Sequence, residues 1–272
     1  MTFRPIGICW AITNKCNYKC PFCFAFTSKV NANYKIQLKI ISALKKQKIK
    51  YVSITGGEPF LEKNLLKIVK ELKKEDIFVS IDTNGSLLKK NNQILNYIDQ
   101  ISMPLDGSTN NICYKVRNRK NLLSIFDNAI RLIKTKQILI RANTLVCKDN
   151  IYDLKNIYNH INKYENKNII WNLIQYYPIN KAVSKYILNP KRYMSILKMF
   201  KSEQRINNIF LYHTKKFQES YIVLDPVGNI YIKSNNKHNI IGNILKDDLK
   251  RLLTKTKFFN KALHVMRYAK HL

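Results

Sequence analysis

The feature that most constrains this chain is an alternation of short β-branched runs with longer, lysine-rich stretches. The alternation extends from residue 6 to about residue 174, with no fixed-period repeat and no low-complexity linker. In the lysine-rich stretches, apolar residues recur every three or four positions, as they do on one face of a helix. Strands that alternate with helices in this way are typical of βα units and a parallel sheet.

Six strands and five helices are predicted over this region. The expected strands cover residues 6–12, 51–55, 77–82, 101–105, 138–146 and 169–174. The expected helices cover residues 35–47, 62–73, 94–99, 122–134 and 151–164. Because six βα units do not complete a barrel of eight, we expect an α/β fold with a partial (βα)6 TIM-like barrel. Its functional residues should lie on the loops after the carboxyl ends of the strands.

The pattern changes after Pro178. A helix is predicted near residues 190–206, and two short strands at 221–224 and 229–232 flank a Pro-Val-Gly-Asn turn, which indicates a hairpin. A last helix is predicted near residues 247–254. We therefore expect a barrel core over residues 1–178 and a C-terminal α+β extension, residues 179–272, that caps the open side of the barrel.

The composition excludes a disordered chain and gives no sign of a membrane protein. The 272 residues are 46% hydrophobic, enough for a sizeable core. No stretch approaches the roughly 18–20 continuous apolar residues that cross a membrane, and residues 1–5 show no leader pattern. We expect a cytoplasmic protein without a membrane partner.

The net charge is strongly positive: 48 Lys and Arg against 17 Asp and Glu give +31. Lys, Asn and Ile are abundant, as AT-rich coding sequences tend to make them, so part of this charge reflects codon usage. Codon usage does not explain the shortage of acids. We therefore expect an anionic substrate, such as a nucleotide or RNA.

Three of the six cysteines form a CxxxCxxC motif directly after the first predicted strand: Cys16, Cys20 and Cys23. A disulfide framework would spread its cysteines, so a tight cluster indicates a metal site. Iron–sulfur cubes are normally held by four thiolates, and three would leave one iron open to a substrate or cofactor. A closed zinc site needs four ligands, and no further Cys or His lies at a typical spacing. We favour the iron–sulfur cluster and keep zinc as the alternative.

Glycine-bearing polar turns follow the second, third and fourth predicted strands. The turns are Thr55-Gly56-Gly57-Glu58, Asp82-Thr83-Asn84-Gly85 and Leu105-Asp106-Gly107-Ser108. They hold four of only seven glycines in the chain, which indicates that backbone geometry or close approach of a ligand requires them. On the fifth strand, Arg141 and Asn143 alternate with apolar residues, so both should face the barrel interior.

These motifs resemble those of the radical S-adenosylmethionine (radical SAM) enzymes over about residues 6–177. The family motif is CxxxCxΦC with an aromatic Φ, and Phe22 fills the aromatic place. The resemblance implies that the three cysteines bind a [4Fe-4S] cluster whose open iron chelates the amino and carboxylate groups of S-adenosylmethionine. One electron then cleaves the sulfonium to methionine and a 5′-deoxyadenosyl radical.

The resemblance also implies the contacts to S-adenosylmethionine. The GGEP segment contacts its amino group, and Arg141 would satisfy its carboxylate. On the fourth strand Pro104 stands where Ser is common, so Ser102 or Asp106 takes the ribose contact. The residues expected to bind S-adenosylmethionine are Phe22, Thr55, Gly56, Gly57, Glu58, Asn84, Ser102, Asp106, Arg141 and Asn143.

Three segments are further similar to viperin-like enzymes, which dehydrate the ribose of nucleoside triphosphates. They are the cysteine motif through Phe24, the turn Asn84-Gly85-Ser86 and the run from Ser220 to Asp225. Tyr221 matches a tyrosine of that last segment and could supply a proton or hydrogen atom, or be a half-buried strand aromatic. The basic residues expected beside Trp171 for triphosphate binding are absent, with Ile170 and Asn172 in their place.

We therefore expect a radical SAM enzyme that abstracts hydrogen from a nucleotide or RNA and takes electrons from a donor such as flavodoxin or ferredoxin. A peptide-modifying enzyme is one alternative, although no cysteine follows Cys147 to hold an auxiliary cluster. A glycyl-radical activase and a zinc-containing nucleic-acid-binding protein are the others. The basic run Lys115, Arg117, Arg119 and Lys120 could cradle phosphate or form a solvated face.

Overall fold

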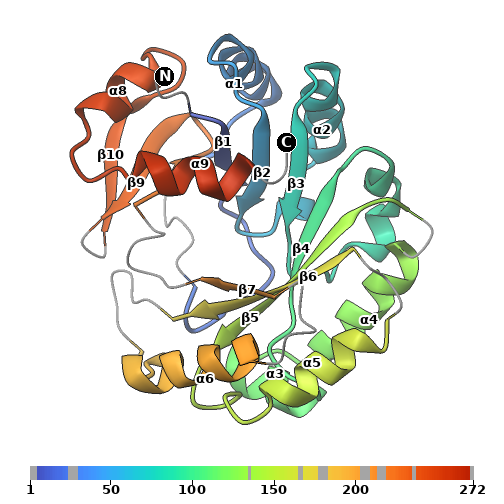
Figure 1. Ribbon diagram of the computed structural model, residues 1–272. Helices are drawn as coiled ribbons and strands as arrows, with labels where there is room; N and C mark the ends of the chain where they lie inside the picture. Colours follow the sequence, from blue (N-terminus) through green and yellow to red (C-terminus); the bar gives the residue numbers. More distant parts are fainter. Residues whose placement is uncertain are drawn as a thin grey trace.

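The computed structural model describes residues 5–23, 30–133, 136–164, 168–176, 183–202, 209–212, 219–234 and 237–269. Ten strands in these ranges form one sheet, in the order β10-β9-β8-β1-β2-β3-β4-β5-β6-β7 (Figure 1). The strands are β1 Gly7–Thr13, β2 Tyr51–Gly56, β3 Phe78–Asp82, β4 Gln100–Pro104, β5 Leu139–Val146, β6 Ile169–Gln175, β7 Ile209–Tyr212, β8 Ile222–Leu224, β9 Asn229–Ser234 and β10 Lys237–Asn243. The sheet ends at β10 and β7 and does not close, which confirms the expected open α/β architecture.

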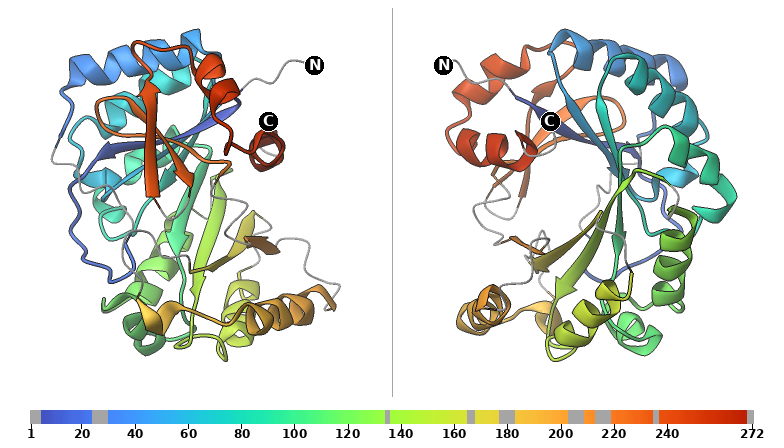
Figure 2. Two further views of the ribbon diagram at one scale, coloured as in Figure 1. Left: turned by 90° about the vertical axis from the view of Figure 1, so that its left-hand side faces the viewer. Right: turned by 45° about the vertical axis from the view of Figure 1, so that its right-hand side comes forward.

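Neighbouring strands from β1 to β7 pair in parallel, and the helices that connect β1 to β6 lie on the outer side of the curved sheet (Figure 2). The helices are α1 Tyr34–Lys46, α2 Leu65–Lys74, α3 Asn110–Arg117, α4 Leu122–Ile133, α5 Leu154–Asn162, α6 Pro190–Ser202, α8 Leu249–Lys255 and α9 Lys261–Ala269. Three short 3₁₀ segments are η1 Pro59–Leu61, η2 Lys89–Asn96 and η3 Ser184–Tyr186. Within the described ranges, no helix has the length and apolar character to cross a membrane.

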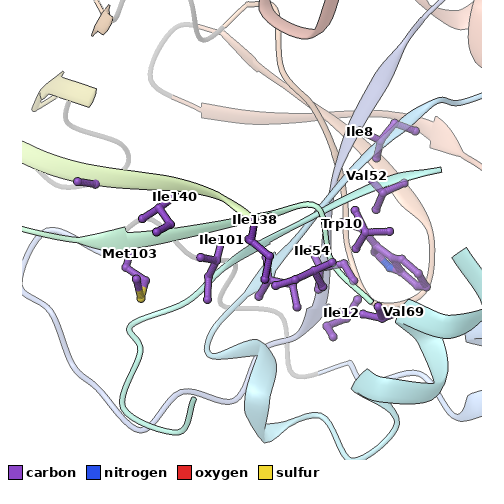
Figure 3. Packing of buried hydrophobic residues seen from close by; sticks show 14 of the residues in the cluster. Ile8, Trp10, Ile12, Val52, Ile54, Val69, Ile101, Met103, Ile138 and Ile140 are labelled. Carbon is purple, nitrogen blue, oxygen red and sulfur yellow. The ribbon is translucent and has the colours of Figure 1, made fainter. Parts of the chain in front are cut away.

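Every second residue of the central strands points outward into the main core. On β1 these residues are Ile8, Trp10 and Ile12, which belong to one buried cluster with Val52 and Ile54 of β2 (Figure 3). Helix α2 covers this cluster with a buried apolar face, while its lysines lie opposite. The intervening strand positions face the inside of the curve, so the period of two in the sequence separates a hydrophobic outer layer from a polar interior.

The segment after residue 178 extends the barrel sheet. Strand β8 pairs in parallel with β1, and β8 and β9 form the expected antiparallel hairpin, with Ile222 opposite Ile232. Strands β7 and β10 and helix α9 were not expected. Strand β7 has four residues and pairs with β6, and α9 contacts the amino end of β1, so both depend on elements far away in the chain. Strand β10 pairs with the adjacent β9, but its polar sequence has no clear alternation.

One predicted helix was wrong, and one helix was missed. The helix expected over residues 94–99 is a 3₁₀ segment, η2, that lies earlier in the chain and has a non-helical residue at Asn91. Helix α3 was not predicted, because its eight residues follow a glycine-bearing turn and have a narrow buried face of Cys113 and Val116. Thr109 caps its first turn through a hydrogen bond from the Ile112 N–H to the threonine hydroxyl.

Helix α9 packs across the amino end of β1, which brings the two ends of the described chain side by side (Figure 1). The Nε2 atom of His264 accepts hydrogen bonds from the backbone N–H groups of Ile6 (3.0 Å) and Gly7 (3.5 Å), and its Nδ1 lies 2.9 Å from the Ser220 carbonyl oxygen. His264 is fully buried, and burial lowers its pKa from 6.5 to about 4, with the charge of Arg267 acting in the same direction. A neutral imidazole therefore joins α9 to β1 and to the segment before β8.

We predict that protonation at His264 weakens the fold in mild acid. The His264 imidazole takes up a proton near pH 6.5 in the unfolded chain, but only near pH 4 in the folded chain. The free energy of unfolding should therefore fall by about 3 kcal/mol between these values from this residue alone. Urea unfolding of wild type and His264→Gln at several pH values measures the difference. Parallel pH profiles for the two proteins would contradict the prediction.

Candidate active site

The three motif cysteines lie on the loop that leaves the carboxyl end of β1. Cys16 and Cys23 are exposed and Cys20 is half-buried. The backbone N–H of Tyr18 donates to the Cys16 sulfur at 3.3 Å, and the N–H of Cys23 donates to the Cys20 carbonyl at 3.0 Å. These bonds fold the motif into a compact loop at one rim of the barrel.

The three motif thiols do not converge on one point. Among the residues that the structure describes, no three His, Cys, Asp or Glu side chains converge to hold one ion. A cube gives each thiolate its own iron, so its ligands can be more widely spaced than those of zinc. Burial raises the pKa of the Cys20 thiol, and the Arg117 guanidinium opposes this rise, as a site for bound thiolates requires.

The Gly56-Gly57 turn after β2 is hydrogen-bonded to the backbone at the start of this loop. The Gly57 N–H donates to the Thr13 carbonyl and the Glu58 N–H to the Lys15 carbonyl, both at 2.8 Å. A Cβ on Gly56, whose φ is +141°, would lie 2.3 Å from the Thr13 oxygen, and one on Gly57 would lie 2.1 Å from the Lys15 oxygen. These glycines therefore allow the turn after β2 to approach the backbone of the cysteine loop closely. The sequence alone had also allowed a close approach to a ligand.

The Glu58 carboxylate, which is fully buried, connects two rim turns. Its Oε1 accepts from the Phe60 N–H (3.2 Å) and the Thr83 hydroxyl (2.7 Å), and its Oε2 accepts from the Asn84 N–H (2.8 Å). Burial raises the pKa of Glu58, and these three hydrogen bonds partly offset the rise. Glu58 also caps η1, so its charge lies at the N-terminus of this short 3₁₀ segment. Both of its oxygens are engaged by the chain.

Asn84 joins the turn after β3 to the cysteine loop. Its side-chain amide donates to the Asn17 side-chain oxygen at 2.9 Å, and the Asn17 amide donates to the Ser86 hydroxyl at 2.9 Å. Asn17 is the residue directly after Cys16. The turns after β2 and β3 therefore both contact the loop that carries the cysteines.

The two candidates for the ribose contact, Ser102 on β4 and Asp106 just after it, lie in different environments. Ser102 faces the interior opposite Asp82, whose carboxylate accepts a hydrogen bond from the Ser53 hydroxyl at 3.0 Å. Asp106 is buried: one oxygen accepts from the Leu145 N–H at 2.8 Å, and the other forms an ion pair with Arg117. Because Asp106 has both oxygens engaged, Ser102 is the better placed of the two for a ligand.

The structure places Arg141 and Asn143 on the inner face of β5, as expected, because Ile140 and Ala142, which alternate with them, belong to the outer core. Asn143 accepts a hydrogen bond from the Asn172 side chain of β6 at 2.8 Å. Burial raises the pKa of Asp82, and the Arg141 charge opposes that rise, so Arg141 lies near this carboxylate. The inner face of β2–β6 therefore carries a run of polar side chains that extends from Ser53 to Asn172.

A sequence profile of the radical SAM superfamily matches residues 10–161, more than half of the chain. The chain belongs to the radical SAM superfamily. Enzymes of this family use a [4Fe-4S] cluster and S-adenosylmethionine, so the expectations of an enzyme and of these two cofactors are confirmed.

Several relatives of this radical SAM enzyme are named for reactions of nucleotides. The S-adenosylmethionine-dependent nucleotide dehydratase of Fibrobacter sp. (strain UWH6) is 25% identical, over 88% of this chain and 80% of its own length. That of Lacinutrix mariniflava is 26% identical over 88% of this chain, which covers 52% of the relative. A GTP 3′,8-cyclase of Staphylococcus epidermidis is 28% identical over 64% of this chain and 57% of its own. The chain thus spans between about half and four-fifths of these proteins.

Solved structures share the fold at low sequence identity. The anSMEcpe structure with bound AdoMet and Cp18Cys peptide has a TM-score of 0.72 and 18% identity, and the match covers 96% of this chain and 83% of that one. Streptococcus suis SuiB bound to S-adenosylmethionine has a TM-score of 0.68 and 18% identity, with 97% and 68% covered. These likenesses confirm the partial-barrel fold of the radical SAM enzyme.

Tyr221 lies at the end of the barrel opposite the cysteines. Strand β8 is parallel to β1 and pairs Val223 with Cys9, so Tyr221 lies level with the start of β1, roughly 20 Å along the strand from its end. The Arg267 guanidinium of α9 stacks on the Tyr221 ring, with 3.5 Å between its carbon and the ring centre. A substrate that reaches both the cysteine rim and Tyr221 must therefore extend through the barrel.

Three basic residues at the site were missed or misread from the sequence. Lys233 is buried on the inner face of β9, and its alternation with the core residues Ile230 and Ile232 could have placed it there. Arg117 and Arg119 contact the cysteine loop, but their position depends on α3, which the sequence did not predict.

We predict that Glu58→Gln lowers the free energy of unfolding by disrupting the contacts between the turns after β2 and β3. A glutamine cannot accept with both terminal atoms, so its NH₂ group would face the Asn84 N–H or the Thr83 hydroxyl. An unsatisfied buried donor costs about 1–3 kcal/mol, and the radical SAM enzyme should lose that much unfolding free energy. Glu62→Gln, on the half-exposed residue just after η1, is the matched control. Equal urea midpoints for the two variants would show that the Glu58 hydrogen bonds do not stabilise the turns after β2 and β3.

Proposed function

We propose that this radical SAM enzyme acts on a nucleotide. When bound, the cofactors supply the radical: one electron from the [4Fe-4S] cluster cleaves S-adenosylmethionine to methionine and a 5′-deoxyadenosyl radical, which abstracts hydrogen from the substrate. Flavodoxin or ferredoxin is the class of electron donor that we propose.

The residues of this chain have four tasks in the proposed reaction. Cys16, Cys20 and Cys23 bind the cluster, and the turns around Gly57, Glu58 and Asn84 keep their loop at the rim. Arg141 pairs with the carboxylate of S-adenosylmethionine, and Ser102 contacts its ribose. The partial barrel encloses the reacting atoms and excludes water from the radical.

The observation that carries the nucleotide assignment is the similarity to nucleotide dehydratases over 88% of the chain. It extends well beyond the 10–161 span of the superfamily profile, which all radical SAM enzymes share. The C-terminal strands β8 and β9, which complete the interior, therefore lie in the part of the chain that can carry a preference for a substrate class.

The charge of the interior supports an anionic substrate. Lys233 is 8% exposed, and burial lowers its pKa to about 8, with the nearby Arg267 cation acting in the same direction. An anion would stabilise the charged form of such a lysine. Lys233 lies on the inner face that also bears Arg141, so a phosphate chain at the amino end of the barrel would meet basic side chains of β9 and α9.

A peptide substrate is the second candidate, because the anSMEcpe structure contains a peptide. At 18% identity that likeness concerns the fold, whereas the nucleotide dehydratases share more sequence. No cysteine follows Cys147, so this chain lacks the thiols for an auxiliary cluster in its C-terminal segment. Both points favour the nucleotide.

The substrate class is tested with anaerobically reconstituted enzyme, dithionite and S-adenosylmethionine. With ATP, GTP, CTP or UTP added singly, we expect one nucleotide to raise 5′-deoxyadenosine at least tenfold over the rate without nucleotide, as read by liquid chromatography and mass spectrometry. Tyr221→Phe should still form 5′-deoxyadenosine, because Tyr221 lies roughly 20 Å along the strand from the cysteine rim. Less nucleotide product from this variant would place Tyr221 at the far end of a substrate that extends through the barrel. No stimulation by any of the four, with stimulation by a short peptide or RNA, would overturn the nucleotide assignment.

A second prediction concerns Lys233. Lys233→Gln should raise the KM for the nucleotide about tenfold, because a charge-assisted hydrogen bond to phosphate is lost, while kcat changes less. Lys237→Gln, which removes the same charge from the exposed start of β10, is the control. The same KM in both variants would remove Lys233 from the substrate site.

A further inference from the structure

Two arginines at and just after the end of helix α3 contact the cysteine loop. Arg117 is the last residue of the helix, and Arg119 follows after Asn118. Asn118 has φ 56° and ψ 40°, a left-handed conformation that asparagine tolerates and that ends a helix sharply. The reversal at Asn118 lets the two arginines contact the same loop.

Each arginine covers one aromatic ring of the motif. The guanidinium carbon of Arg119 lies 5.0 Å from the centre of the Tyr18 ring, and that of Arg117 lies 4.9 Å from the Phe22 ring. Tyr18 stands between the first two cysteines and Phe22 between the last two. Both distances are within the range of a cation–π interaction. The pair therefore holds both halves of the CxxxCxxC loop.

Arg117 is itself fixed from the barrel side. Its Nε donates to the buried carboxylate of Asp106, and its guanidinium also reaches the Cys20 thiol. The other Asp106 oxygen accepts the Leu145 N–H of β5, so the ion pair is attached to the sheet. This explains why the basic run after β4 is not simply a solvated face.

The 3₁₀ segment η3, which follows β6, also contacts the cysteine loop. The Tyr186 ring of η3 meets the Phe22 ring edge-on, 5.1 Å between centres. The Tyr186 hydroxyl donates to the Val116 carbonyl of α3 at 2.7 Å. Phe22 is thus enclosed between Arg117 and Tyr186, which themselves belong to connected elements.

We propose that Arg117 and Arg119 are positioning residues that fix the cysteine loop and make its bound cluster easier to reduce. The proposal rests on the assignment of the three cysteines as cluster ligands and is independent of the nucleotide. Reduction adds one negative charge to the cluster, and nearby cations stabilise the more negative state. A planar guanidinium can stack on a ring and supply charge at once, whereas lysine supplies charge alone.

The main variant is Arg119→Gln, which leaves the Asp106–Arg117 ion pair in place. Lys120→Gln removes the same charge from the next, exposed residue and is the matched control. Arg119→Lys keeps the charge but not the flat stacking group. The double variant D106N/R117Q removes both partners of the buried pair, so that no lone charge remains inside.

The first measurement uses the chain without cluster. Hydrogen exchange over residues 16–23, read by mass spectrometry, should be at least threefold faster in Arg119→Gln, Arg119→Lys and the double variant than in wild type or Lys120→Gln. Exchange elsewhere in the sheet serves as the internal standard, since a variant that failed to fold would exchange everywhere.

The second measurement is a reductive titration of the reconstituted cluster, followed by electron paramagnetic resonance without S-adenosylmethionine or nucleotide. At a fixed potential, the ratio of reduced to oxidised cluster should fall at least tenfold in Arg119→Gln, a shift of 59 mV for one electron. Arg119→Lys and Lys120→Gln should titrate like wild type. Exchange rates and titrations of Arg119→Gln and D106N/R117Q that match Lys120→Gln would overturn the proposal. Neither assay contains a nucleotide, so both results test the arginine proposal even if the proposed substrate class is wrong.

Discussion

Two backbone hydrogen bonds, from Gly57 to Thr13 and from Glu58 to Lys15, set the geometry on which the rest of the site depends. They attach the turn after β2 to the loop that carries the three cysteines. Glycine is required at both positions because a Cβ would collide with the loop's own carbonyl oxygens. The cysteine loop therefore takes its place from a rigid parallel sheet, although most of its residues are outside any strand or helix.

Side chains around that attachment divide into neutral and charged contacts. Asn17 and Asn84 join the loop to the turn after β3 by amide hydrogen bonds, and Glu58 connects that turn to the one after β2. On the other side, Arg117 and Arg119 contact the loop through charge and aromatic stacking. Deeper in the barrel Lys233 adds a further cation. Some of the chain's net charge of +31 is therefore concentrated where a reduced cluster and an anionic substrate would lie.

Much of the fold could be predicted from the sequence because its strands and helices are strongly periodic. The CxxxCxxC motif and the glycine turns also identified the rim, since their residues sit directly after strands. Much of what could not be predicted depends on contacts between distant elements: β7 needs β6, and α9 needs the amino end of β1. The same holds for Asp106, which looked like a ligand contact but is engaged by Arg117 from an unpredicted helix. Strand β10 pairs with the adjacent β9, and it was missed because its own sequence is polar and irregular.

The central claim is that the loop of Cys16, Cys20 and Cys23 holds a four-iron cluster with one iron open to S-adenosylmethionine. The most direct test is electron paramagnetic resonance of the anaerobically reconstituted and reduced protein, recorded with and without S-adenosylmethionine. The account predicts a [4Fe-4S]⁺ signal that changes when S-adenosylmethionine is added and is lost in Cys20→Ala. A protein that binds zinc and gives no such signal, or a cluster signal that S-adenosylmethionine leaves unchanged, would contradict it.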